Sequence, residues 1–309
     1  MAATTSFGAD GIWLKREDEH ELGAFKWRGA AAVLAAKQRE LEASAAEPPT
    51  PGRKTGPPSA ALGVVVTAST GNHGAATAWA ARRAGVRAVV FVPEAASAAK
   101  MALIEAQGAE LHRVGSDLDE AKAAARDYAA EHGAFFFEDG AEPEQFDGYE
   151  PIGHELLDEL PEPGAVVVPV GNGALAIGIF RALAQRAPGA RRVAVSAAEA
   201  PAMWESWRAG RPTDSERCST FADGLAVRVA IPLAVAELNP LVQQFELVSE
   251  EELEAAVRAF AEEGIRAEGG AAAPLALALR EALPRPVVLI VTGRNIDDVL
   301  YDRILTHGT

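Results

Sequence analysis

Apolar and polar positions along the chain follow two patterns, short β-branched runs and longer amphipathic stretches. The short runs predict buried strands at residues 12–16, 62–69, 86–92, 110–114, 133–137, 165–170, 192–196 and 287–291. The amphipathic stretches predict helices at residues 30–44, 75–84, 96–107, 117–131, 174–187, 201–208, 250–263 and 271–282. Strands that alternate with helices of this length predict an α/β fold with mostly parallel sheets and right-handed crossovers.

The order of these elements predicts two three-layer domains with a ligand cleft between them. Residues 1–60 and 143–309 form the predicted large domain, and residues 61–142 form the small one. Five prolines with small and polar neighbours predict a mobile surface loop at residues 45–60. The longest uncharged run, residues 163–180, contains Pro169, Asn172 and four glycines, so it predicts a strand, a turn and a helix start, and no transmembrane segment.

Charge and cysteine content narrow the range of partners. The chain of 309 residues has 44 acidic and 29 basic residues, a formal net charge of -15. This charge argues against binding to nucleic acid and to anionic membranes, and favours a small-molecule partner. Cys218 is the only cysteine, which excludes an intramolecular disulfide framework, and the first residues lack the pattern of a secretory signal. A cytoplasmic location is therefore expected.

Residues 23–30, Gly-Ala-Phe-Lys-Trp-Arg-Gly-Ala, contain a lysine in unusual surroundings. A lysine is ordinarily a solvated surface charge, but Phe25 and Trp27 flank Lys26, and glycines lie close on both sides. Burial disfavours the ammonium form, and a neutral amine condenses with an aldehyde. A lysine that forms a Schiff base is the functional alternative to a surface charge.

Three turns each follow an apolar strand and precede a helix, where open α/β sheets bind ligands. Residues 68–74, Ala-Ser-Thr-Gly-Asn-His-Gly, put polar groups at a helix N-terminus suited to a carboxylate. Residues 171–174, Gly-Asn-Gly-Ala, form a small-residue turn that suits a phosphate, without P-loop or dinucleotide spacing. Thr292 and Gly293 follow the last strand. Each turn taken singly also fits plain helix capping or tight packing.

In this order, together with Phe-Ala-Asp-Gly-Leu-Ala-Val at residues 221–227, the motifs resemble the threonine and serine dehydratases among the fold-type-II pyridoxal-phosphate (PLP) enzymes, the superfamily of the tryptophan synthase β-subunit. The resemblance runs from about residue 12 to residue 304. It implies that PLP lies in the cleft between the two domains and that the enzyme is a homodimer.

The resemblance also implies roles for individual residues. Lys26 would form the Schiff base with PLP and move the α-proton of the substrate, and Phe25 would pack on the cofactor ring. Asn72 would contact the ring oxygen, and Thr292 would bond the pyridine nitrogen. The substrate carboxylate would be bound by Ser69, Thr70, Gly71 and His73, and the cofactor phosphate by Gly171, Asn172, Gly173 and Ala174. No metal is expected, because only Glu199 of the family's acidic cluster has a clear counterpart.

The reaction that the resemblance implies is α,β-elimination and deamination of a small β-hydroxy amino acid, L-threonine or L-serine, to a 2-oxo acid and ammonia. A hydroxyl at Thr292 does not keep the pyridine nitrogen protonated, which favours elimination over transamination. The Val-Gly-Asn-Gly turn is closer to threonine synthases, so β- or γ-replacement of the threonine synthase or cysteine synthase type is the alternative. A racemase, with Thr70 opposite the lysine, and a binding protein without activity complete the hypotheses.

Overall fold

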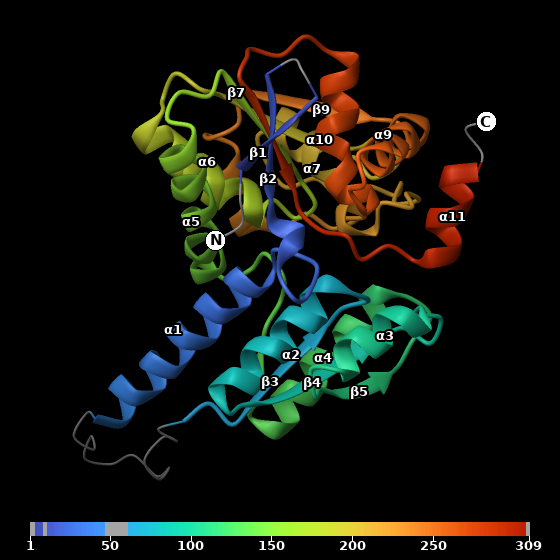
Figure 1. Cartoon of the computed structure of the whole chain (residues 1–309). Coiled ribbons are helices and arrows are strands. Elements are labelled where there is room, and N and C mark those ends of the chain that lie inside the picture. Colours follow the sequence, from blue (N-terminus) through green and yellow to red (C-terminus); the bar gives the residue numbers. More distant parts are fainter. Residues whose placement is uncertain (1–3, 9–10, 47–60, 307–309) are drawn as a thin grey trace. The chain divides into compact units, whose positions relative to one another are not determined.

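The structure is a computed structural model, and it describes residues 4–8, 11–46 and 61–306 (Figure 1). Most of the predicted loop, residues 47–60, lies outside the described residues, and residues 45 and 46 end a helix. The chain divides into two compact units. Unit 1 comprises residues 1–25 and 149–309, and unit 2 comprises residues 26–148.

Unit 1 contains a six-stranded sheet in which only the first strand is antiparallel to its neighbour. In sheet order the strands are β1 (Thr4–Phe7), β2 (Ile12–Arg16), β10 (Val287–Val291), β7 (Ala165–Pro169), β8 (Arg191–Ala197) and β9 (Gln244–Val248). Val288 of β10 is paired with Val166 of β7. Since the two strands are parallel, the turns that follow them leave the sheet at the same edge.

Helices cover both faces of this sheet, because alternate residues of the strands are buried on each side. Leu289 and Val291 share a core cluster with α9 (Glu250–Glu262) and α10 (Gly269–Arg280). The intervening Val288 and Ile290 are equally buried, and α6 (Ala174–Arg186) packs on β7 and β8. Two shorter helices of the unit are α7 (Ala202–Ala209) and α11 (Asp298–Thr306). The unit therefore has the predicted three layers.

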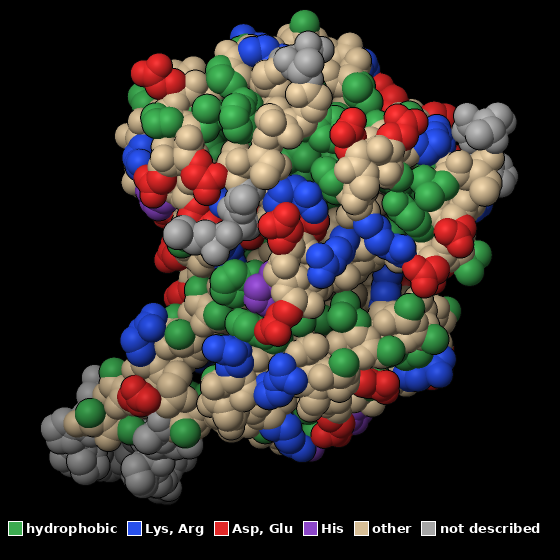
Figure 2. Space-filling model, in the orientation of Figure 1, with side chains coloured by type: hydrophobic (Ala, Val, Ile, Leu, Met, Phe, Trp, Pro, Cys, Tyr) green, Lys and Arg blue, Asp and Glu red, His purple; other side chains and the backbone are tan. Residues whose placement is uncertain are grey.

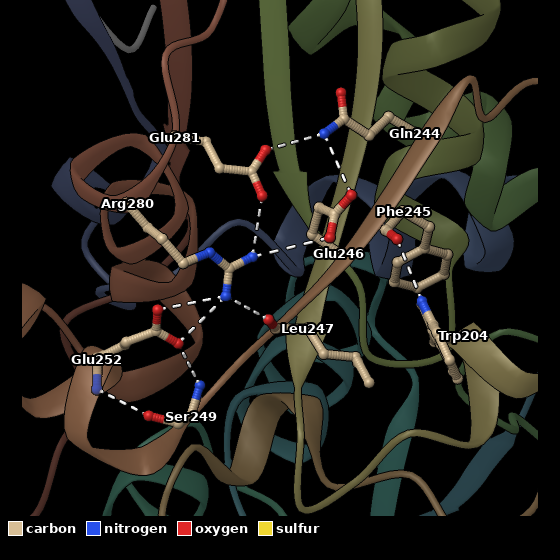
Figure 3. A network of polar contacts seen from close by, with 9 residues as sticks. All are labelled: Trp204, Gln244, Phe245, Glu246, Leu247, Ser249, Glu252, Arg280 and Glu281. Carbon is tan, nitrogen blue, oxygen red and sulfur yellow. Dashed lines mark hydrogen bonds and ion pairs between the residues drawn. The ribbon is translucent and has the colours of Figure 1, made fainter.

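The end of α10 is fixed by the polar network drawn in Figure 3. Arg280 donates hydrogen bonds to the carbonyl of Leu247 and to the carboxylates of Glu252 and Glu281. Glu252 also completes a capping box with Ser249 at the start of α9. The network ties the C-terminal end of α10 to β9 and α9. At the other end of α10, Gly269 packs directly on Ala222 of the Phe221–Val227 motif.

Unit 2 contains a four-stranded parallel sheet covered on both faces. Its strands, in sheet order, are β5 (Glu110–Arg113), β4 (Arg87–Val92), β3 (Val64–Ala68) and β6 (Phe135–Phe136). Val66, Val89 and Phe91 pack against α4 (Leu118–His132). On the other face, Val90 and Val92 pack against α2 (Asn72–Ala84) and Ile104 of α3 (Ala98–Glu105). This unit is also a three-layer α/β structure.

The division of the chain differs from the predicted domain boundaries, which put residues 26–60 in the large domain. Helix α1 (Trp27–Ala46) packs against α2, and the rings of Trp27 and Trp79 are 5.6 Å apart. Gly148 packs closely on α1, because a Cβ at this position would lie 2.8 Å from the Arg28 carbonyl oxygen. The same unit therefore extends to residue 148. These contacts place α1 in unit 2.

The sequence prediction missed several elements of the structure. They are β1, β9, α5 (Pro143–Glu159), α8 (Pro232–Leu238) and the first turn of α2, which begins three residues earlier than predicted. Helix α5 escaped prediction because Gly148, Pro151 and Gly153 lie inside it. The predicted strand, turn and helix start within residues 163–180 are confirmed.

The surface carries both signs of charge. On the face drawn in Figure 2, acidic and basic side chains are interspersed among apolar ones, although the chain as a whole has a net charge of -15. No helix among the described residues is long and apolar enough to cross a membrane.

Candidate active site

Lys26 lies in unit 2, immediately before the first residue of α1. Its backbone carbonyl accepts a hydrogen bond from the Ala30 amide at 3.1 Å, which is the first turn of that helix. Its side chain is only 16% exposed, and Nζ lies 2.5 Å from Oδ2 of Asp139. The burial inferred from the flanking aromatic residues is thus present, and an acidic partner comes with it.

Asp139 follows β6 and is supported from two sides. Nε2 of Gln145 donates to its other oxygen, Oδ1, at 2.6 Å, and Nδ1 of His73 lies 3.6 Å from the same atom. Burial alone would raise the pKa of Asp139, but the charge of Lys26 and the hydrogen bonds from Lys26 and Gln145 hold it well below its usual range. The carboxylate is therefore ionised at neutral pH.

His73 lies in the first turn of α2, with its ring packed edge-on against Phe137 at 4.6 Å. Its Nε2 is 3.5 Å from the Phe137 carbonyl oxygen. Burial lowers the pKa of His73 below its ordinary value, and the charge of Asp139 opposes this shift without cancelling it. The imidazole is therefore neutral at pH 7.

Pairing between β3 and β6 explains why these side chains meet. Val65 and Val66 are paired with Phe135 and Phe136 in parallel, so the segments after both strands leave at one edge of the sheet. The Thr67 hydroxyl donates to the Phe137 carbonyl at 2.7 Å and fixes the second segment beside the first. The predicted carboxylate turn and Asp139 thus share one end of this sheet.

The predicted carboxylate turn connects β3 to the N-terminus of α2. Ser69 is buried, and its hydroxyl accepts a hydrogen bond from the Gly71 amide at 3.1 Å. Gly71 occupies the cap position, and Thr70 is half-buried. The helix that begins at Asn72 is 13 residues long, so its first amides and its dipole favour an anion here.

The predicted phosphate turn lies in unit 1, between β7 and α6. A Cβ on Gly171 would lie 2.3 Å from the carbonyl oxygen of Gly224, and Gly173 has a φ of +98°. The side chain of Asn172 accepts a hydrogen bond from the Ala174 amide at 3.0 Å. Apart from Asn172, the turn therefore consists of glycine and alanine at a helix N-terminus, where backbone amides bind phosphate oxygens.

Phe25 and Thr292 are neighbours in unit 1. The Phe25 amide donates to the Thr292 carbonyl at 3.1 Å, and a bridge joins Ala24 to Gly293. The Phe25 ring packs on Tyr149, with centroids 5.0 Å apart. Thr292 is 4% exposed and directly follows β10. Thr292, a buried residue with a hydroxyl group, is thus bonded through its backbone to Phe25, which is predicted to pack on the cofactor ring.

Comparisons with known proteins identify the family. Residues 2–293 match the family model described as pyridoxal-phosphate dependent enzyme. The chain belongs to this family. It is 33% identical over 301 residues to an L-threonine ammonia-lyase of Geobacter sulfurreducens, covering 96% of this chain and 70% of the relative. It is 32% identical over 300 residues to an L-threonine ammonia-lyase of Thermotoga maritima, with the same coverage.

Solved structures of related enzymes have the same fold. A threonine deaminase from Solanum lycopersicum superposes with a TM-score of 0.83 at 26% identity, over 95% of this chain and 82% of that one. Maize serine racemase gives a TM-score of 0.81 at 26% identity, over 96% and 87%. The predicted fold type II is confirmed, and so is the prediction that the cofactor is PLP.

The residues present fit this cofactor. The turn at residues 171–174 could accept the phosphate, Thr292 has a hydroxyl for the pyridine nitrogen, and Phe25 has an aromatic ring, as the predicted packing on the cofactor requires. Lys26 offers the amine. The structure places these residues in two units, with Lys26 and residues 69–73 in unit 2 and the others in unit 1. That both sets serve one cofactor stays a prediction, as do the individual roles.

Sequence reasoning missed three polar residues near these positions. Asp139 and Gln145 follow the predicted strand at residues 133–137. This strand is parallel to β3, so polar residues after it could have been expected at the same sheet edge as the carboxylate turn. Glu268 is 5% exposed, and its carboxylate lies so close to Gly293 that a Cβ there would be 2.5 Å from it. Among the described residues, no cluster of three or more His, Cys, Asp or Glu side chains could hold a metal ion.

Proposed function

We propose that this PLP enzyme is an ammonia-lyase that acts on a small β-hydroxy amino acid of the L-threonine or L-serine type and releases a 2-oxo acid and ammonia. The observation that carries the proposal is the similarity to L-threonine ammonia-lyases over 96% of the chain. All the predicted site motifs lie within residues 2–293, the part that matches the family model.

The chain's own residues supply binding, positioning and proton transfer. The amides at the start of α2 and the Ser69 hydroxyl bind the substrate carboxylate, which orients the substrate. The amine of Lys26 takes the α-proton. Pyridoxal phosphate, when bound, supplies an electron sink for the electron pair that the departing proton leaves behind. The turn at residues 171–174, Phe25 and Thr292 would hold the cofactor.

A substrate panel tests the proposal. Purified protein loaded with PLP is incubated with L-serine, L-threonine, 3-hydroxyaspartate, 2,3-diaminopropionate and O-phosphohomoserine, and both 2-oxo acid and ammonia are measured. We expect stoichiometric oxo acid and ammonia from serine or threonine. Product only from O-phosphohomoserine would support the replacement type instead, and inversion of the α-carbon without oxo acid would support a racemase.

The lysine assignment has its own test. Borohydride reduction of the loaded protein should fix the cofactor on the peptide that contains Lys26, as mass spectrometry would show. Lys26→Ala should lose the reducible visible band and at least about 10³-fold of the oxo-acid rate, because both bond formation and proton transfer depend on this amine. Turnover at the parent rate by a folded, loaded Lys26→Ala protein would refute the role.

The cytoplasmic location and the homodimeric state stay predictions. Cell fractionation tests the first, and light scattering of the purified protein tests the second.

A further inference from the structure

The contact between Lys26 and Asp139 differs from the surface ion pairs of the same unit. Both side chains are largely buried, at 16% and 25% exposed. Asp139 is held by Gln145, a fully buried side chain that is itself fixed by a hydrogen bond from the Gly140 amide at 2.7 Å. The neighbouring Glu138 is similarly buried, at 20% exposed, but it pairs with two more exposed cations, Lys122 at 26% and Arg126 at 54%, and not with Lys26. The carboxylate beside Lys26 is therefore built into the sheet edge.

We propose that Asp139 is a positioning residue for Lys26, which aims the amine and compensates its positive charge after it has taken a proton from the substrate. This inference rests on the proposed function. It adds a residue that none of the recognised motifs contains.

Charge balance in the proton transfer gives Asp139 its role. When the neutral amine of Lys26 takes the α-proton, the Cα–H bond breaks, an Nζ–H bond forms, and the electron pair stays with the substrate. The nitrogen becomes an ammonium in a site largely closed to water, where an uncompensated charge is costly. Asp139 supplies the opposite charge 2.5 Å away and neither gains nor loses a proton. Charge-assisted hydrogen bonds of this kind are stronger than neutral ones.

Geometry also lets one carboxylate contact three neighbours without moving. Oδ2 faces Lys26, while Oδ1 accepts from Gln145 and faces His73. A carboxylate fixed at one oxygen can use its other oxygen to hold a long, flexible lysine side chain in one orientation.

The same ion pair opposes the binding of the cofactor. Lys26 must leave Asp139 and give up a proton before its amine can bond the cofactor aldehyde.

These two effects predict changes of opposite sign in Asp139→Asn. Apoprotein of the variant should recombine with PLP at least as fast as the parent, followed through the visible band. Loaded variant should exchange the α-hydrogen of the amino acid with deuterated water about ten- to a hundredfold more slowly, as one lost charged hydrogen bond implies. Asp139→Glu, which keeps the charge, should restore part of the exchange rate.

Glu138→Gln is the matched control, because it removes a carboxylate from the adjacent position without touching Lys26. It should leave both rates unchanged. Gln145→Met leaves Asp139 in place and removes its hydrogen bond from Gln145, together with the hydrogen bond that Gln145 accepts from the Gly140 amide, so it should slow exchange to a smaller extent. This variant decides the question if Asp139→Asn does not fold.

Parental exchange in Asp139→Asn would overturn the proposal, and so would a parallel loss of exchange and recombination, which a merely structural role predicts. Both readouts are independent of β-elimination. If the parent exchanges the α-hydrogen but forms no oxo acid, the proposed function fails while the role of Asp139 is still decided. If the parent protein does not exchange the α-hydrogen, the rate at which apoprotein recombines with PLP decides. Slower recombination in Asp139→Asn than in Glu138→Gln would overturn the proposal.

Discussion

Replacement of Gly171 by alanine tests whether the turn at residues 171–174 is shaped by contact with the Phe221–Val227 motif. In the structure, a Cβ at this position would lie 2.3 Å from the carbonyl oxygen of Gly224, whereas ordinary contacts begin at 3.4 Å. The carbonyl belongs to the backbone and the position of a Cβ is fixed by the backbone, so neither atom can rotate away. The turn or the motif must therefore move by about 1 Å.

The expected cost follows from this overlap. Extra atoms forced into a packed region cost about 1–3 kcal/mol. If the turn moves, its amides leave the positions in which they bind the phosphate, and the cost corresponds to about five- to 150-fold weaker PLP binding. If the motif moves instead, the cost reduces the free energy of unfolding. Titration of apoprotein with PLP and denaturant unfolding together measure the two contributions.

Gly189→Ala is the control for this prediction. Gly189 precedes β8 in the same unit and does not adopt a left-handed backbone conformation, and a Cβ added to it would meet nothing within 4 Å apart from its chain neighbours. Its replacement should change neither quantity by more than about 0.5 kcal/mol. Parental PLP affinity combined with a parental unfolding midpoint in Gly171→Ala would refute the reasoning.

Two further predictions concern Thr292 and His73. Thr292→Val keeps the shape of a buried side chain and removes its hydroxyl, so PLP binding to the apoprotein should weaken about two- to tenfold, the cost of one neutral hydrogen bond; unchanged affinity would refute the hydroxyl's role. Because the pKa of His73 is lowered by folding, the unfolded chain binds more protons below pH 6.5, and the free energy of unfolding should fall as the pH decreases from about 6.5 to 5. His73→Asn should show a shallower decrease in denaturant unfolding over that range, and an equally steep one would contradict the prediction.

The sequence predicted the local structure around each candidate turn. Each predicted turn lies between one strand and the next helix, so the run of residues itself specifies the strand end, the glycines and the helix start. Residues 69–73, residues 171–174 and Thr292 all lie at carboxyl ends of strands, as predicted. The parallel sheets followed from the alternation of elements by the same reasoning.

The contacts of Lys26 were not predictable in the same way. Asp139 is 113 residues away in sequence, and the two meet because β6 pairs with β3 while α1 packs on α2. Residue 139 also follows a strand of only two residues, Phe135 and Phe136, whose pairing a sequence pattern does not reveal. The predicted domain boundary at residue 60 differs from the start of unit 2 at residue 26 for a related reason. The packing of α1 on α2, which decides the unit of α1, is a tertiary contact.

The composition of the turn Gly171-Asn172-Gly173-Ala174 follows from the same geometry. Only two positions of this turn require a glycine in the structure. Gly171 is required by the contact with Gly224, and Gly173 by its φ of +98°. Asn172 has no left-handed backbone, and Ala174 is already the first residue of α6. Glycine therefore occupies the two positions where the backbone geometry excludes a side chain. At position 172 a side chain fits, and that of Asn172 accepts a hydrogen bond from the Ala174 amide.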